Sequence, residues 1–140
     1  MRRSIHRSVL AVVVAALTAG ACGDKGTETP TTPTEVVETV TETFSGTLTP
    51  NGARTFPFSA LAGSVTAVLT TLGSDSTLAV GLSLGTWSGS VCQIVLANDN
   101  ALQGSFVVGE ASSVSSLCVR VYDVGDLVEP LDFVVTVTHR

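Results

Sequence analysis

The chain has 140 residues, of which 44% are hydrophobic and 14% charged, so it fits one ordinary domain and excludes a large multidomain enzyme. Seven basic and 12 acidic residues give a net charge of −5, and three of the arginines lie within the first seven residues. Without those three, the balance is 4 basic against 12 acidic residues, or −8. Such an acidic body has no patch that neutralises phosphates, which argues against nucleic acid and anionic membrane surfaces as partners.

Residues 1–21 have the three-part pattern of a secretory signal peptide. A basic start is followed by an apolar stretch from about Val9 to Leu17 and then by small residues that end at Cys22. The apolar stretch is shorter than the roughly 20 residues that span a bilayer, which disfavours a permanent transmembrane helix. The chain is therefore expected to be exported.

The small residues Ala19-Gly20-Ala21 before Cys22 resemble the bacterial lipobox. The resemblance implies that Cys22 carries a diacylglyceryl group, becomes the mature N-terminus and anchors the protein to a membrane through palmitate-like acyl chains. It also implies a location in the bacterial cell envelope, at the outer membrane, the cell surface or the periplasm. Ala19 departs from the Leu, Val or Ile preferred at its position, so cleavage by an ordinary signal peptidase and free secretion is the alternative.

Residues 22–43 are expected to form a flexible linker between the anchored cysteine and a folded domain. The segment is rich in Thr and Glu and contains Pro30 and Pro33, with too few apolar residues to offset the entropy of ordering. At roughly 3.3 Å a residue, about 20 residues would hold the domain at most about 65 Å from the membrane. Alternatively, Val36, Val37 and Val40 begin the first strand.

Residues 44–140 are expected to form an all-β domain. Short segments rich in Val, Thr, Leu and Ser alternate with Gly, Pro, Asn or Asp, and none shows a sustained helical stripe. This spacing predicts an antiparallel, jelly-roll-like β-sandwich of about eight strands. The expected strands are 43–49, 54–59, 64–72, 77–84, 90–97, 104–108, 115–123 and 131–138.

Two of these segments also predict which side chains face the core. Every second residue of 131–138 is apolar, as a half-buried strand requires. In 115–123 one face is apolar, whereas the opposite face carries Cys118, Arg120 and Tyr122. The inward face of each strand is thereby assigned from the sequence.

Cys92 and Cys118 are expected to form a disulfide. If Cys22 carries the lipid, the other two cysteines remain as a pair in an oxidising compartment. The alternative is two buried free thiols. Strand parity places Cys118 beside Arg120 but Cys92 beside apolar residues such as Ile94, which are opposite kinds of face. Either the strand phase changes in one segment or the bond lies near a strand end.

Five segments of the chain resemble the bacterial pre-peptidase C-terminal (PPC) domain. The resemblance covers almost all of residues 44–138 and implies a β-sandwich of the kind found at the ends of secreted peptidases and other exported bacterial proteins. Some relatives in that family bind calcium, collagen or glycans. The chain departs from the family by having its own lipid signal and no attached peptidase. The matching segments are Phe44–Leu48, Arg54–Phe58, Gly63–Leu69, Cys118–Asp123 and Phe133–Val137.

Two stretches rich in oxygen ligands could hold a structural calcium ion. Calcium prefers roughly six to eight oxygens from carboxylates, amides and backbone carbonyls. The alternative is that Asn and Asp occur there because they tolerate turn geometry and hydrogen-bond to their own backbone. No other cofactor is implied. The candidate ligands are Asn98, Asp99 and Asn100 in one expected turn, and Asp123 and Asp126 in an acidic loop.

Three larger side chains are candidates for a binding surface. Trp87, expected at the tip of a turn over residues 85–89, could stack on a sugar or anchor a protein contact. The alternative is that it folds back over the end of the sandwich. Arg120 and Tyr122 share one strand face and could extend a binding surface, or they could form a solvent-facing pair.

The sequence offers no convincing catalytic group. His139 is the only histidine after the signal peptide, and it lies beside the C-terminal Arg140 at an end expected to fray, so it is a poor oriented base. No Cys/His cluster after residue 21 has zinc spacing. We therefore expect a non-catalytic module that binds a glycan or an envelope protein, with a purely structural envelope lipoprotein as the alternative.

The position of Trp87 distinguishes these functional classes. Binding predicts that Trp87 is exposed beside polar groups, whereas a structural role predicts that it is packed. An enzyme would instead require a deep pocket with at least two converging titratable groups.

Overall fold

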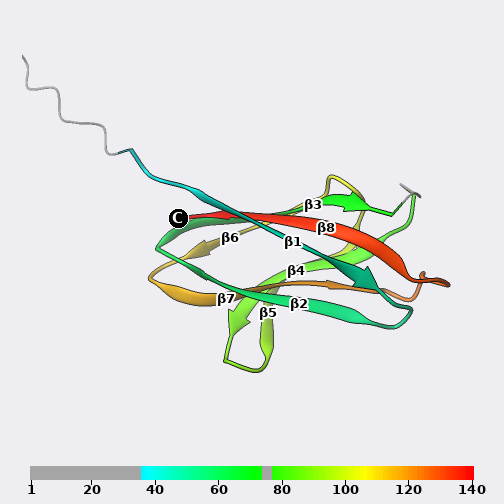
Figure 1. Ribbon diagram of the computed structural model, residues 1–140. Coiled ribbons are helices and arrows are strands. Elements are labelled where there is room, and N and C mark those ends of the chain that lie inside the picture. The colour runs from blue at the N-terminus through cyan, green and yellow to red at the C-terminus, as the bar shows by residue number, and fades with distance from the viewer. Residues whose placement is uncertain (1–35, 74–76) are drawn as a thin grey trace, which may run out of the picture. The chain divides into compact units, whose positions relative to one another are not determined.

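Eight strands make up the part of the chain that the computed structural model describes, residues 36–73 and 77–140. The signal peptide, Cys22 and the linker up to residue 35 lie outside the described residues. No segment of the described ranges is a helix that could cross a membrane. The strands are β1 (Val40–Leu48), β2 (Ala53–Ala60), β3 (Gly63–Leu72), β4 (Val80–Trp87), β5 (Cys92–Ala101), β6 (Phe106–Ala111), β7 (Ser115–Tyr122) and β8 (Leu131–His139) (Figure 1).

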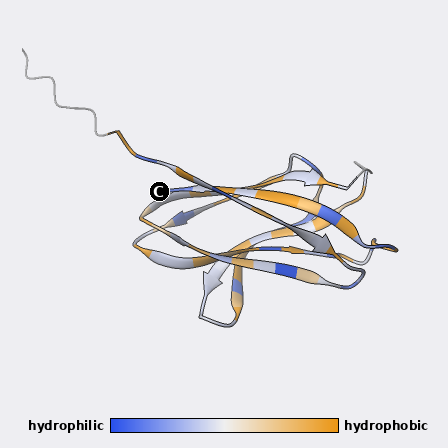
Figure 2. Cartoon of the chain, in the orientation of Figure 1, coloured by the Kyte–Doolittle hydropathy of each residue, from blue (hydrophilic) through white to orange (hydrophobic). Residues whose placement is uncertain are grey.

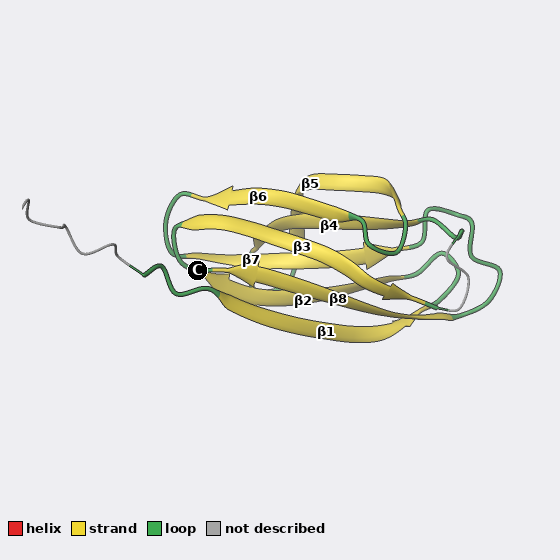
Figure 3. Ribbon diagram, turned by 90° about the horizontal axis from the view of Figure 1, so that it is seen from above, coloured by secondary structure: helices red, strands yellow, loops and turns green. Residues whose placement is uncertain are grey.

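The strands form two antiparallel four-stranded sheets. Sheet A has the order β1-β8-β3-β6, and sheet B has the order β2-β7-β4-β5 (Figure 3). Consecutive strands mostly lie in opposite sheets, so the chain alternates between the layers in the manner of a jelly roll. The predicted all-β, jelly-roll-like sandwich is thus confirmed.

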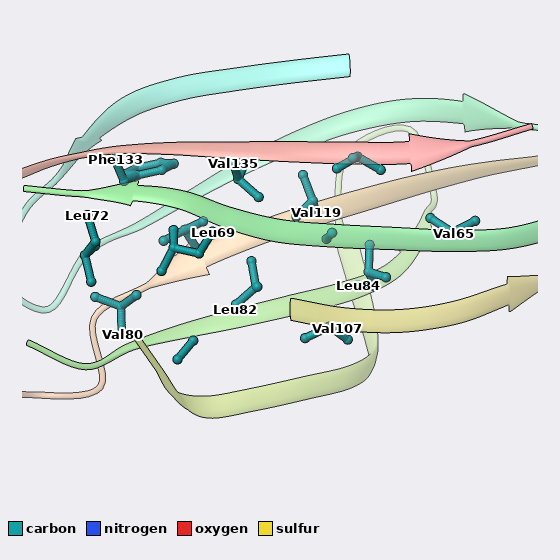
Figure 4. Close-up of a cluster of buried hydrophobic side chains, with 14 of the residues drawn as sticks. Val65, Leu69, Leu72, Val80, Leu82, Leu84, Val107, Val119, Phe133 and Val135 are labelled. Atoms are coloured by element: carbon teal, nitrogen blue, oxygen red, sulfur yellow. The ribbon is translucent and has the colours of Figure 1, made fainter. Parts of the chain in front are cut away.

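The hydrophobic core lies between the two sheets. Leu69 of β3 and Phe133 of β8 come from sheet A, and Leu82 of β4 and Val119 of β7 come from sheet B (Figure 4). All four side chains are buried. From residue 133 to residue 139 of β8 the side chains alternate between buried and half-buried, as the sequence predicted, and the strand carries a long apolar stretch (Figure 2).

The first strand begins earlier than the sequence suggested. β1 starts at Val40 rather than Thr43, because the segment from Val40 pairs residue by residue with β8, beginning opposite His139. Val36 and Val37 remain exposed and outside the strand. The last residues assigned to the linker therefore belong to sheet A.

The hairpin of β4 and β5 also differs from the prediction. Trp87 is the last residue of β4 and not the tip of a turn, since the turn occupies residues 88–91. Residues 98–100, expected as a turn, lie inside β5 at a point where the register with β4 shifts. A bulge accommodates the extra residue in one strand, so the Asn and Asp residues bend the strand instead of ending it.

The predicted disulfide is present and joins two strands that are not neighbours in the sheet. Cys92 begins β5 and Cys118 lies in β7, with their Cα atoms 5.8 Å apart, although β4 lies between these strands in the order of sheet B. The end of β4 and the start of β5 leave the plane of sheet B on its outer side (Figure 1). The bond therefore fixes β5 across the outer face of the sheet.

Gly85 of β4 makes this crossing possible. A Cβ atom at residue 85 would overlap the backbone of Gln93 in β5, so no side chain fits between the two strands there. Gly85 pairs with Cys118 on one side and with Ile94 on the other. The absence of a side chain lets the two backbones lie one over the other.

A second register shift explains the conflict over the cysteine faces. Leu84 pairs with Leu96 but Gly85 pairs with Ile94, so β5 has one extra residue at Val95. Because an extra residue reverses strand parity, Ile94 and Leu96 do not share a face. The strand phase of β5 therefore changes at Val95, and the disulfide also lies at a strand end, because Cys92 is the first residue of β5. Both explanations considered from the sequence apply.

Removing the disulfide is expected to destabilise the fold. Replacing Cys92 and Cys118 together with serine should lower the free energy of unfolding by about 3.5 kcal/mol, because the bond no longer restricts the unfolded chain. Urea unfolding of the full chain, purified from membranes in detergent and followed by circular dichroism, measures this. Ser90→Ala in the exposed turn is the control. An unchanged free energy in the double variant would contradict the structural role of the bond.

Adding a methyl group to Gly85 tests the crossing of the strands. Gly85→Ala should lower the free energy of unfolding by about 1–3 kcal/mol, the usual cost of overpacking, because the backbone of β5 must move away. Thr86→Ala, at the exposed neighbouring position, should change it little. Equal unfolding midpoints for the two variants in urea would show that β5 does not lie over Gly85.

Candidate functional site

The outer face of sheet B carries a row of small residues on β4. Gly81, Ser83 and Gly85 alternate with buried core residues and face outward. Ser83 is fully buried and its hydroxyl donates a hydrogen bond to the backbone oxygen of Arg120, 3.4 Å away. Because the row has no bulk, larger side chains from the neighbouring strand β7 can lie across it.

Tyr122 occupies the space above Gly81. A Cβ atom on Gly81 would overlap the ring of Tyr122, so the ring lies directly on the glycine. The phenol group crosses β4 and donates a hydrogen bond to the carboxylate of Asp99 in β5. The guanidinium carbon of Arg120 lies 5.6 Å from the centre of the same ring. Asp99, which is 23 residues from Tyr122, thus joins the two candidate residues of β7.

Burial raises the pKa of Tyr122 to about 12, and the hydrogen bond to Asp99 and the negative charge of Asp99 add to this effect. The charge of Arg120 acts in the opposite direction but is the smallest contribution. The phenol therefore stays protonated at neutral pH and serves as a hydrogen-bond donor. A phenol held in this state is unsuited to act as a base or a nucleophile.

These residues border an open pocket of about 440 Å³ on the outer face of sheet B. Its polar wall consists of Asp99, Arg120 and Tyr122, and its apolar wall consists of Ile94 and Val124. The disulfide and the bulges in β5 place Ile94 and Asp99 opposite β7. The two candidate binding residues on β7 do line a site, with one candidate calcium ligand beside them.

Trp87 is half-buried and does not line this pocket. It pairs with Cys92 at the point where the hairpin leaves the sheet. A binding role predicts an exposed Trp87 and a structural role predicts a packed one, and the half-buried side chain matches neither prediction. Trp87 therefore does not distinguish between the two roles.

The candidate calcium ligands lie in two places and serve other contacts. Asn98 accepts a hydrogen bond from the backbone N–H of Asn100, and Asp99 accepts one from Tyr122. Within residues 36–73 and 77–140, no three acidic, histidine or cysteine side chains are grouped as a metal would require. Calcium binding stays a prediction that this arrangement does not favour.

Asp123 organises the loops at one end of the sandwich. One carboxylate oxygen accepts the backbone N–H of Asn51, and the other accepts those of Gly125, Asp126 and Leu127. The hydrogen bond from Asn51 is the largest of the causes that lower the pKa of Asp123. The carboxylate therefore ties the β1–β2 turn to the β7–β8 loop, which is the turn role considered for Asp in the sequence.

His139 is ordered, which corrects the expectation that it frays. The ring is 4% exposed, stacks on Phe58 with 5.4 Å between ring centres, and contacts Glu42 through Nε2 at 2.9 Å. Its Nδ1 lies 2.9 Å from the backbone oxygen of Arg140. Both ring nitrogens are therefore occupied, and the contact with Glu42 links the end of β8 to β1.

A second surface follows the free edges of β5 and β6. Eight of the 14 exposed large apolar residues in the described ranges lie on these strands or in the turns beside them, which makes this side the most apolar part of the surface. We call Val95, Leu96, Phe106 and Val108 the β5–β6 patch. Val95 is 68% exposed and Phe106 is 63% exposed.

A pocket of about 210 Å³ opens beside the β5–β6 patch. Leu84, Leu117 and Val65 form its apolar floor, and Val95 and Leu96 form part of its rim. Glu110 is the charged residue of its lining. The pocket has the size and character to receive one apolar side chain of a partner.

The sequence interpretation overlooked this patch. A strand was predicted at 104–108, where Phe106, Val107 and Val108 are all apolar. Because only one face of an edge strand is usually buried, at least one of these side chains had to be exposed. In the structure Val107 is buried, whereas Phe106 and Val108 are exposed. An uninterrupted apolar run in a short strand was the available signal.

Comparisons with known proteins establish the fold and nothing finer. No family model matches the chain, and no curated protein matches it. Among solved structures it is similar to the crystal structure of Aeromonas hydrophila PliG, a periplasmic lysozyme inhibitor of g-type lysozyme. The two chains are 16% identical with a TM-score of 0.50, over 69% of this chain and 83% of PliG. The PPC resemblance stays a prediction.

The titration of Tyr122 tests the contacts that form the pocket. Tyr122 is the only tyrosine, so the absorbance of its phenolate reports on this site alone. The midpoint should lie near 12 and not at the ordinary value of 10.0. Because the folded-state pKa is the higher one, the contact with Asp99 stabilises the fold below pH 10.0 and is lost as the pH rises towards 12.

Two variants should lower that midpoint. Asp99→Asn removes the charge but leaves the burial, so the pKa should fall towards 10.0 without reaching it. Gly81→Ala should also lower it, because the added methyl group displaces the ring. Asp126→Asn in the β7–β8 loop is the control. If all three variants titrate like the native protein, Tyr122 does not contact Asp99.

Proposed function

We propose that this chain is an exported, lipid-anchored binding protein of the bacterial cell envelope that recognises a protein partner through the β5–β6 patch and catalyses no reaction. The observation that carries the proposal is the concentration of exposed apolar side chains on two free strand edges, of which Val95 and Leu96 line an apolar pocket. Exposed apolar patches of this kind typically mark interaction sites.

The edges of β5 and β6 are open to pairing. Edge strands are usually protected from further pairing by proline or by basic side chains. β2, at the other edge of sheet B, contains both Arg54 and Pro57, whereas β5 and β6 contain neither residue type. An extended segment of a partner could therefore add its backbone to either edge and place an apolar side chain in the pocket.

A protein partner suits the described surface better than a glycan. Sugars are usually held by a free aromatic face, but the ring of Tyr122 lies on Gly81 on one side and near the guanidinium of Arg120. The β5–β6 patch instead offers aliphatic side chains and Phe106, which are typical of protein interfaces.

Catalysis is disfavoured by the chemistry of the described groups. Tyr122 keeps its proton at neutral pH. Both ring nitrogens of His139 contact other groups, Glu42 and the backbone of Arg140, and His139 lies in sheet A and does not line the pocket on sheet B. Neither pairing provides a base next to a free nucleophile. The fold likeness to PliG, which is an inhibitor, is compatible with a protein that acts by binding.

The signal peptide and the lipobox-like sequence support export and anchoring. They lie outside the described residues, so their support comes from the sequence. The disulfide agrees with an oxidising compartment. An anchor at Cys22 would keep the domain at the membrane, where a modest affinity for an envelope protein has a larger effect.

Photocrosslinking in cells tests the proposal. A photoreactive amino acid at Val95 or Phe106 should give one discrete adduct with an envelope protein, and the same residue at Thr43 on β1 should not. Purified g-type lysozyme is the first defined partner to test, because PliG inhibits one. Phe106→Lys should remove the adduct, since a charge would have to be buried in the interface, whereas Thr43→Lys should leave it unchanged.

The proposal fails if positions 95 and 106 give no adduct, or if position 43 gives the same adducts. It also fails if Phe106→Lys leaves the adduct formed from Val95 unchanged. Intact mass spectrometry of the membrane fraction tests the anchor separately, because acylation at Cys22 adds a fixed mass to the mature chain. A chain of unmodified mass in the medium would contradict the lipid anchor and would not affect the proposal for the binding surface.

A further inference from the structure

The pocket on the outer face of sheet B contains a positive charge that no carboxylate of the described residues pairs with. The guanidinium of Arg120 has no carboxylate of the described residues within 4.0 Å, and its Nε–H is buried without a hydrogen-bond acceptor. Leaving a buried donor unsatisfied usually costs about 1–3 kcal/mol, and more for a charged group. Arg120 lines the pocket, so a ligand that enters the pocket can bring an acceptor to the guanidinium.

The other arginine of the same sheet shows the contrast. Arg54 of β2 is exposed, and its Nε donates to the backbone oxygen of Thr47 at 3.0 Å. Arg120 lies in the middle of the sheet, with Thr55 of β2 on one side and Ser83 of β4 on the other. These neighbours are short, so they leave the guanidinium accessible from the pocket.

Asp99 is the only other charged group that lines the pocket, and it does not neutralise Arg120. One of its oxygens is used by the phenol of Tyr122. Its charge would repel an anion that approached the Tyr122 end of the pocket, so an anionic ligand has to enter at the Arg120 end. The second oxygen of Asp99 can accept a hydrogen bond from a hydroxyl or amide group of the same ligand.

We propose that this pocket binds a carboxylate group, which the guanidinium of Arg120 holds through two parallel hydrogen bonds, while Asp99 accepts a hydrogen bond from a neighbouring donor of the ligand. Two coplanar oxygens match the two donors on one edge of a guanidinium. A phosphate would bring more negative charge towards Asp99 and the acidic chain. Ile94 and Val124 contact the apolar part of the ligand.

The volume of about 440 Å³ admits a group of the size of one sugar or one amino acid side chain. The carboxylate could therefore come from a sugar acid or from an acidic residue of a peptide. The shared chemistry is the carboxylate beside a hydrogen-bond donor. This inference does not depend on the β5–β6 patch, and it can hold or fail independently of that surface.

Two matched pairs of probes test the inference and identify the source. The full chain in detergent micelles is titrated with glucuronate and with glucose, and with the peptide acetyl-Ala-Glu-Ala-amide and its glutamine analogue. The side-chain Nε–H resonance of Arg120 is followed by NMR. At least one charged probe should shift this resonance and bind about tenfold or more tightly than its neutral analogue, since a charge-assisted pair is lost in the analogue.

The variants that accompany these titrations are matched by residue type. Arg120→Gln and Arg120→Lys should each weaken binding of the charged probe by about tenfold or more, because neither keeps the two-donor edge. Arg54→Gln should leave it unchanged. Binding should also weaken as salt is added, because the interaction is between charges near the surface.

The native protein alone can overturn the proposal, even if a variant fails to fold. Charged and neutral probes of equal affinity, or no shift of the Arg120 resonance with either charged probe, would exclude a carboxylate site. Binding that Arg54→Gln abolishes and Arg120→Gln does not would place the site elsewhere. If only glucuronate discriminates, the ligand is a sugar acid, and if only the glutamate peptide does, it is an acidic peptide.

Discussion

The crossing of β5 over β4 is the constraint on which the surfaces of this protein depend. In a regular sheet, β4 would separate β5 from β7 and no bond could join them. At Gly85 there is no side chain between the backbones, and the bond between Cys92 and Cys118 holds the crossing in place. The bond links residues 26 apart, so it restricts the unfolded chain as well as the folded sheet.

Two surfaces follow from this one arrangement. On the outer side of sheet B, the crossing brings Ile94 and Asp99 opposite Arg120 and Tyr122 and closes one side of a pocket. At the sheet edge, the bulge in β5 leaves Val95 exposed next to β6, where the apolar pocket opens. A polar pocket and an apolar patch therefore share one strand. Because disulfides persist in oxidising compartments and are rare in reducing ones, the shape of both surfaces depends on an oxidising environment.

The chemistry of the two surfaces points to binding. Tyr122 and Asp99 are used to hold β7 and β5 together, and a phenol that keeps its proton provides rigidity instead of reactivity. Arg120 is the exception, since none of the described carboxylates pairs with its charge and its Nε–H has no acceptor among the described residues. His139, rejected from the sequence as a base, and Asp123, a candidate calcium ligand, instead fasten strand ends and loops. Tyr122, His139 and Asp123 thus have hydrogen-bond partners within the fold, whereas Arg120 has a donor that a ligand could use.

The sequence by itself determined the all-β class, the number of strands and the pairing of Cys92 with Cys118, because these depend on local periodicity and on counting. The export signal stays a prediction of the sequence. The sequence also identified Arg120 and Tyr122 as facing outward, since strand parity is a local property. Tertiary structure decided that Asp99 joins them, that Trp87 does not, and that Phe106 and Val108 stay exposed. The physical reason is that bulges in β5 reverse its parity, and a bulge depends on how two strands pair across the fold, which no single segment specifies.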